Sequence, residues 1–156
     1  MPARRQKDDQ AEEQPAKGEL SWLEEAECYE LLATQPVGRI ALAAPGEAPL
    51  VEPVNYVLDG RAIVFRTGAG TKLGLLRLGP VSFEVDWVDP HHRSGWSVLA
   101  RGMAYEATHY ETDHLELEPW APGDRNRWVR LVVSELSGRR LGPADLGWGT
   151  HRAAYL

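Results

Sequence analysis

Apolar and polar side chains alternate strictly over residues 81–87, and no other feature of the sequence constrains the fold as strongly. The apolar positions are Val81, Phe83, Val85 and Trp87, and the polar positions between them are Ser82, Glu84 and Asp86. Successive side chains of a β-strand point to opposite faces of a sheet. The alternation therefore predicts a strand with one buried face and one solvated face.

Five further segments have the two-residue period of strands and are bounded by residues typical of turns. They span residues 37–43, 50–58, 62–67, 96–108 and 128–136. Asp59-Gly60 predicts a hairpin turn, and the length of the fourth segment indicates a bend at Gly102. Tight turns favour an antiparallel sheet, and closing six strands into a barrel removes exposed edges. We therefore expect a mainly β fold, a six-stranded antiparallel barrel with short helices.

The helices are expected outside this barrel. Helical patterns cover residues 21–35, which begin with a Ser21/Glu24 capping box, residues 71–78, and residues 111–118. Residues 1–19 offer little apolar surface to pack and predict a disordered tail. We expect one domain over residues 20–141, followed by a C-terminal extension over residues 142–156.

Composition excludes several classes of function. A net charge of −6 and a pI near 5.4 argue against nucleic acid as a partner. No apolar run approaches the roughly 20 residues of a membrane span, and the N-terminus lacks a secretory pattern, so we expect a cytoplasmic protein with no membrane partner. The single cysteine, Cys28, excludes an internal disulfide and is expected to be a small buried hydrophobe. His91 and His92 are adjacent and complete no carboxylate motif, so no metal site is expected.

The stretch from Arg66 to Lys72 has the residues of an anion site. Arg66 ends a strand, the turn Gly68-Ala69-Gly70 lets the backbone approach a ligand, and Thr71-Lys72 begins a helix. The order differs from that of a Walker loop, so a nucleotide triphosphatase is not supported. The same residues also fit a glycine turn with solvent-facing cations, and this motif alone leaves both interpretations open.

Five sets of residues follow one another along the chain in a characteristic order. They are Pro53-Val54-Asn55-Tyr56, Phe65-Arg66-Thr67 with Gly70-Thr71-Lys72-Leu73, Phe83-Glu84-Val85-Asp86, Gly95-Trp96-Ser97-Val98 with Arg101-Gly102, and Gly138-Arg139-Arg140. In order and spacing they resemble the FMN-binding split-barrel proteins of the pyridoxamine 5′-phosphate oxidase-like superfamily. The resemblance covers about residues 20–141 and implies a split β-barrel.

The resemblance also implies a cofactor and a set of residues that bind it. Arg66, Thr67, Thr71 and Lys72 would hold the phosphate of FMN, and Val54, Asn55 and Tyr56 would line its isoalloxazine ring. Family members are usually homodimers with the flavin at the subunit interface, where Trp96 and Ser97 would contribute from the same or the other chain. A strand edge offers N–H and C=O groups to the ring, and a phosphate dianion requires clustered positive charge.

The function implied by this resemblance is that of a flavin-dependent oxidoreductase acting on a small-molecule substrate. The cofactor would carry the redox chemistry, and no catalytic side chain is identified from spacing. Deazaflavin or haem remains an alternative cofactor, because the same cluster could hold a deazaflavin and some split-barrel relatives bind haem. A non-catalytic carrier or sensor remains the alternative function.

Overall fold

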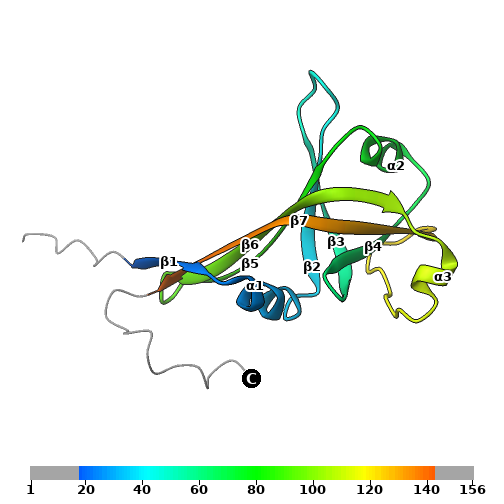
Figure 1. The fold of residues 1–156 in the computed structure, drawn as a ribbon. Helices are drawn as coiled ribbons and strands as arrows, with labels where there is room; N and C mark the ends of the chain where they lie inside the picture. Colours follow the sequence, from blue (N-terminus) through cyan, green and yellow to red (C-terminus); the bar gives the residue numbers. More distant parts are fainter. Residues whose placement is uncertain (1–17, 143–156) are drawn as a thin grey trace, which may run out of the picture.

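Six antiparallel strands close into a barrel in the computed structural model, which describes residues 18–142. Figure 1 shows the ribbon. In chain order the elements are β1 (Glu19–Leu23), α1 (Glu25–Leu32), β2 (Val37–Leu42), β3 (Leu50–Asp59), β4 (Ala62–Thr67), α2 (Thr71–Leu76), β5 (Val81–Asp89), β6 (Ser94–Glu106), α3 (His109–Thr112) and β7 (Arg127–Gly142). The barrel order is β7-β4-β3-β2-β5-β6, and pairing of β6 with β7 closes it. This confirms the mainly β, six-stranded antiparallel barrel.

The barrel interior is filled by the alternate residues of its strands. Phe83 of β5 lies at the centre and is fully buried. Its ring meets Tyr56 edge-on, with centroids 5.0 Å apart, and stacks on Phe65 at 6.5 Å. The α2 helix adds Leu76 to this core. Val81, Phe83 and Val85 point inward, as the alternation in residues 81–87 predicts, whereas Trp87 at the end of this pattern is only partly buried.

The first helix begins later than the sequence pattern predicts. Ser21 lies in β1, and Glu24 caps α1 through a capping box with Glu27. Residues 19–23 pair instead with the last part of β7, from Gly138 to Gly142. Cross-strand pairing therefore decides the conformation of Ser21, and the expectation of a helix from this residue is wrong.

The last strand is longer than expected. Residues 128–136 carry the strand pattern, whereas β7 continues to Gly142 because β1 and β6 pair with its two edges. Arg139 and Arg140, which follow the segment predicted as a strand, therefore lie within a sheet. The bend expected at Gly102 is confirmed by a shift in register between Arg101 and Gly102.

The third helix is shorter than predicted and precedes most of the segment assigned to it. Residues 111–118 were expected to be helical, but α3 spans only His109–Thr112 and is capped by a Thr108/Glu111 capping box. The chain from 113 to 126 forms an irregular segment that returns to β7. This segment lies beside β4, at the end of the molecule opposite β1 (Figure 1).

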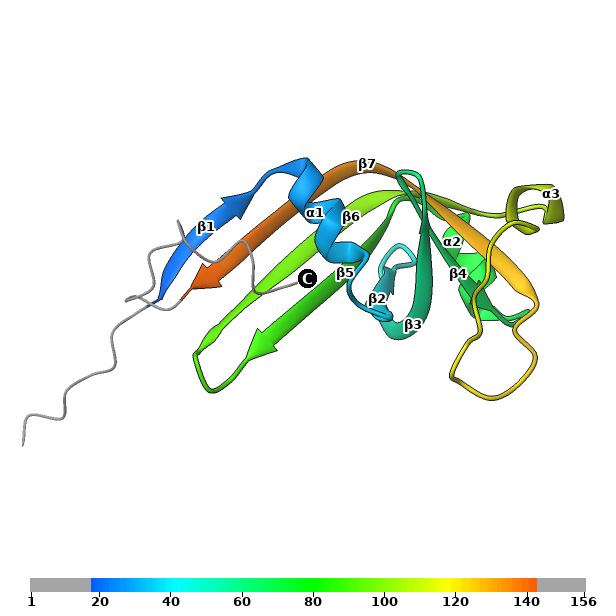
Figure 2. The same ribbon diagram turned by 90° about the horizontal axis from the view of Figure 1, so that it is seen from below.

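The α1 helix covers one face of the long β6–β7 pair, as Figure 2 shows. Cys28, only 1% exposed, packs there against Gly138, where a β-carbon would come within 2.6 Å of the sulfur. The expectation that Cys28 is buried is confirmed.

No helix in residues 18–142 is long and apolar enough to cross a membrane. Most of the predicted tail, residues 1–17, and all but Gly142 of the predicted C-terminal extension lie outside the described residues.

Candidate cofactor site

The barrel is split where β3 and β4 separate. The two strands pair from Asp59↔Ala62 to Tyr56↔Phe65, and the ladder ends there. Beyond this point, residues 50–55 pair with β2, whereas residues 66–67 pair with β7. Val54 and Asn55 thus border one side of the split, and Arg66 and Thr67 border the other. An edge of β3 at the split is available to hydrogen-bond a ligand.

The segment from 113 to 126 crosses beside this split and is fixed there by two of the predicted site residues. The Trp120 backbone N–H donates to Asn55 Oδ1 at 2.8 Å. Arg66 donates from Nε to the Arg125 carbonyl and from Nη1 to the Leu117 carbonyl, both at 2.9 Å. Asn55 and Arg66 therefore both bind the backbone of the segment from 113 to 126. No local sequence pattern predicts this shared contact.

Arg66 is a fixed cation whose contacts leave its charge uncompensated. Besides the two carbonyl oxygens, its guanidinium lies over the Trp128 ring, 5.1 Å from the centroid. These partners within residues 18–142 are all neutral. Arg125 lies on the segment from 113 to 126, and its carbonyl accepts one of the hydrogen bonds from Arg66. The Nε of Arg125 is buried and has no hydrogen-bond partner in the described part of the chain. The Arg66 guanidinium at the split, with the unsatisfied Nε of Arg125 on the segment that Arg66 contacts, favours an anionic ligand, so the donor chemistry fits a phosphorylated cofactor.

Of the other residues predicted to hold phosphate, Thr67 and Lys72 have side-chain surroundings that differ from those of Arg66. Thr67 follows it in β4, so the two side chains point to opposite faces, and Thr67 is buried. Thr71 begins α2, but its side chain lies outside the described residues. Lys72 forms an ion pair with Glu52 of β3, and its side chain is only 10% exposed. The sequence motifs missed Glu52, which directly precedes one motif but contacts Lys72 only in the folded chain, and Arg125, which lies on a segment distant in sequence from Arg66.

The residues predicted to line the ring have different orientations. Val54 and Tyr56 point into the core, and the Tyr56 hydroxyl donates to the Leu32 carbonyl. Burial raises the pKa of the Tyr56 hydroxyl far above its ordinary value. Asn55 points to the other face and uses both ends of its amide, since its Nδ2 donates to the Pro36 carbonyl at 3.1 Å. Any contact of Val54 or Tyr56 with a ring at the split would therefore come from the backbone.

Trp96 and Ser97 lie at the opposite end of the sheet. They pair with Arg140 and Arg139 of β7, whereas Arg66 pairs with Trp128. Arg139 and Arg140 lie eleven and twelve residues along the extended strand from Trp128, which corresponds to about 40 Å along β7. One chain therefore does not bring Trp96 and Ser97 to the split.

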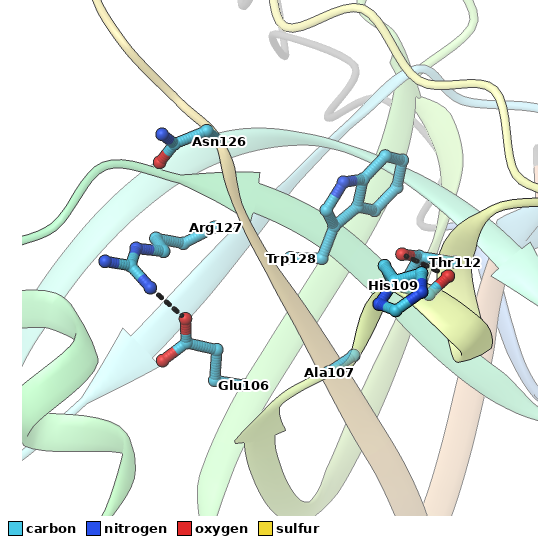
Figure 3. A pocket seen from close by; sticks show the side chains of 7 residues that line it. All are labelled: Glu106, Ala107, His109, Thr112, Asn126, Arg127 and Trp128. Carbon is cyan, nitrogen blue, oxygen red and sulfur yellow. Dashed lines mark hydrogen bonds and ion pairs between the residues drawn. The ribbon is translucent and has the colours of Figure 1, made fainter.

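A pocket of about 490 Å³ lies next to Trp128 (Figure 3). Its lining consists of Glu106, Ala107, His109, Thr112, Asn126, Arg127 and Trp128. Trp128 and His109 lie on one side of the start of β7, and the Arg127–Glu106 ion pair, at 2.9 Å, lies on the other. This volume is in the range of small-molecule sites. Arg66 contacts the Trp128 ring, so the pocket adjoins the split.

The hairpin end of β3 provides a further anchor for the segment beside the site. Asp59 accepts hydrogen bonds from Arg130 of β7 and from His114 Nε2, the latter at 3.1 Å. The hydrogen bond from Arg130 and, to a smaller extent, that from His114 hold the pKa of the Asp59 carboxyl below its ordinary value.

Within residues 18–142, no group of three or more His, Cys, Asp or Glu side chains is arranged to hold a metal.

Comparison with known proteins assigns the family. The family model described as pyridoxamine 5′-phosphate oxidase matches residues 24–140. The uncharacterized protein Rv0080 of Mycobacterium tuberculosis is 33% identical over 133 residues, which are 79% of this chain and 86% of that protein. The chain therefore belongs to the pyridoxamine 5′-phosphate oxidase family, and the resemblance stated from the motifs is confirmed.

Solved structures agree in fold. One from Corynebacterium glutamicum, which bears the name of the family, is 33% identical with a TM-score of 0.70 and covers 80% of this chain and 99% of that chain. The "FAD binding protein from Mycobacterium smegmatis" is 32% identical with a TM-score of 0.67, over 78% of this chain and 98% of that chain.

Proposed function

We propose that this protein binds a phosphorylated flavin, FMN in the first instance, at the split between β3 and β4. The observation that carries the proposal is the fixed charge of Arg66, whose partners in the described chain are all neutral, together with the buried Nε of Arg125, which has no hydrogen-bond partner there. A pre-positioned guanidinium loses little conformational freedom when it binds phosphate. The description of the Mycobacterium smegmatis relative as FAD-binding supports a flavin, and FAD shares the phosphate next to the riboflavin unit.

The remaining residues would hold the other parts of the cofactor. The backbone of Val54 and Asn55 would face the polar edge of the ring, while Thr67 and Lys72 would contribute to the anion site from the inner face. A phosphate contact of Thr71 stays a prediction. The bound flavin would supply redox chemistry, and the protein would supply orientation and exclusion of water. We therefore propose an oxidoreductase with a small-molecule substrate, in which the pocket beside Trp128 is the candidate space for that substrate.

We further propose a homodimer that shares the site between two chains. The separation of Ser97 from the split supports this proposal, since Ser97 would have to come from a partner. An exposed apolar row crosses the sheet near Ser97: Leu20 pairs with Leu141, Leu141 with Gly95, and Gly95 with Val88. Leu20, Leu141 and Val88 are 56%, 41% and 63% exposed. Exposed apolar surface of this kind is typical of an interface.

The proposed cofactor is tested by titrating the purified protein with FMN, FAD, riboflavin, a deazaflavin and haem. We expect saturable binding of FMN or FAD, with riboflavin weaker because it lacks phosphate. Preferential binding of haem, or no binding of any flavin, would contradict the proposal. Oxidation of NADPH or another reductant by the loaded protein then distinguishes an oxidoreductase from a carrier or sensor.

A further inference from the structure

Lys72 already has an anionic partner within its own chain. Its ammonium group forms an ion pair with the Glu52 carboxylate, and the two side chains are 10% and 40% exposed. A nearly buried ammonium is tolerated in a folded chain only where an opposite charge or hydrogen-bond acceptor lies next to it. Glu52 therefore stabilises the position of Lys72 in the ligand-free protein.

Glu52 has this contact because of its place on β3. It lies two residues before Val54, so alternation puts the two side chains on the same, inward face of the strand. Lys72 reaches that face from the first turn of α2. The carboxylate thus belongs to the strand that borders the split, and the ammonium belongs to the helix that follows the Arg66–Gly70 turn.

The Lys72–Glu52 ion pair and the Arg66 guanidinium differ in how strongly they attract an incoming phosphate. The partners of Arg66 in the described chain are neutral, so its attraction for an anion is not reduced by them. At Lys72, a phosphate meets a carboxylate in direct contact with the cation it would bind. Binding there requires the phosphate to displace the Glu52 carboxylate or to accept repulsion from it.

We infer that Glu52 is a positioning residue that competes with the ligand for Lys72, and that it lowers the preference of the protein for phosphorylated over unphosphorylated flavins. This inference rests on the proposed function. It assigns a role to a residue outside the family motifs, because Glu52 stands immediately before Pro53-Val54-Asn55-Tyr56. Removal of the carboxylate charge strengthens the anion site instead of damaging it.

The test is a set of four full-length proteins: wild type, Glu52→Gln, Lys72→Met and the double variant. Dissociation constants for FMN and riboflavin are measured for each, with melting temperatures. We expect Glu52→Gln to tighten FMN by about tenfold and to leave riboflavin nearly unchanged. The same substitution in the Lys72→Met background should tighten FMN by a clearly smaller factor, because no ammonium remains to be released and only the repulsion between Glu52 and the phosphate is removed.

A matched control separates this local effect from a change in net charge. Glu25 pairs with Arg61 on the exposed surface of α1, so Glu25→Gln removes one negative charge and should not change FMN affinity. If Glu52→Gln proves too unstable, Glu52→Asp shortens the side chain by one methylene group. It should tighten FMN in the same direction by a smaller factor.

The outcomes are distinct. Equal FMN affinity in wild type and Glu52→Gln, weaker FMN binding in that variant, or equal tightening of FMN and riboflavin would overturn the role of Glu52 while the flavin site stands. Failure of all four proteins to bind any flavin would overturn the proposed function and this inference with it.

Discussion

The amide of Asn55 joins two segments to β3 at once: its Oδ1 accepts the Trp120 backbone N–H at 2.8 Å, and its Nδ2 donates to the Pro36 carbonyl at 3.1 Å. The segment from 113 to 126 is thereby fixed next to the split. Trp120 itself remains 71% exposed, so its backbone and not its ring is the point of attachment.

Asn55→Ala should loosen this attachment. Loss of the two hydrogen bonds should lower the free energy of unfolding by about 1–2 kcal/mol. The Trp120 amide should also exchange its hydrogen with solvent faster, as measured by NMR or mass spectrometry. Asn55→Asp keeps the acceptor and should retain most of the protection at Trp120. Unchanged exchange at this amide in Asn55→Ala would show that other contacts hold the segment.

Arg66 should contribute to flavin binding through its charge and through its geometry. Arg66→Ala should weaken FMN by about tenfold to a hundredfold, with little effect on riboflavin. Arg66→Lys keeps the charge but loses the fixed planar group that donates to the Leu117 and Arg125 carbonyls. It should therefore bind FMN with intermediate affinity. FMN titrations of both variants that overlay that of wild type would contradict the placement of the anion site.

Asp59 should make stability depend on pH in the acidic range. Hydrogen bonds from Arg130 and His114 lower the pKa of the Asp59 carboxyl from its ordinary value of 3.8. The stabilisation of the folded state by Asp59 is therefore complete above pH 3.8 and is lost as the pH falls through the lowered pKa. The difference in unfolding free energy between wild type and Asp59→Asn should be largest near pH 7 and shrink below pH 3.8. Urea unfolding at several pH values measures it, and a difference independent of pH would contradict this role.

Much of the barrel could be predicted from local sequence, because alternation and turn residues are properties of neighbouring positions. The segment 62–67 was predicted with the observed bounds of β4. The conformation of Ser21 could not be predicted in the same way, since its strand pairs with residues near the other end of the chain. Both Ser21 and Glu24 have the local pattern of a capping box. The pairing of Ser21 with β7 leaves Glu24 as the residue at which the helix begins.

The candidate site shows the same division. Arg66 and Lys72 are predicted to bind an anion because Arg66 ends a strand and Lys72 stands at the start of a helix. Their partners, Glu52 for one and the Leu117 and Arg125 carbonyls for the other, are distant in sequence and carry no motif. The sequence therefore predicts the type of ligand, whereas the contacts that tune its binding depend on the fold.

The contact between α1 and β7 should be sensitive to small changes in volume. A β-carbon at Gly138 would lie 2.6 Å from Cys28 Sγ and 2.9 Å from Leu23 Cδ1, so Gly138→Ala should destabilise the protein by about 1–3 kcal/mol. Cys28→Ala removes the sulfur and should reduce that cost. Equal costs of Gly138→Ala in the two backgrounds, measured by denaturant unfolding, would contradict this packing.

The proposed dimer should depend on the exposed face that carries Ser97. Light scattering should give twice the chain mass of 17.4 kDa. Trp22 pairs with Arg139, the residue that also pairs with Ser97, and it is 74% exposed. Trp22→Lys should therefore shift the protein toward monomer without lowering its thermal stability when dilute. A wild-type monomer that binds flavin fully would contradict a shared site.

The stoichiometry and affinity of FMN binding to wild type and to Arg66→Ala decide whether this chain holds a phosphorylated flavin at the β3–β4 split. Isothermal titration of the purified full-length protein measures both, and the visible absorption spectrum of the complex identifies the bound group. We expect one FMN per chain, bound at least tenfold more tightly by wild type than by Arg66→Ala. Absence of saturable binding to wild type, or equal affinity in the two proteins, would contradict this expectation.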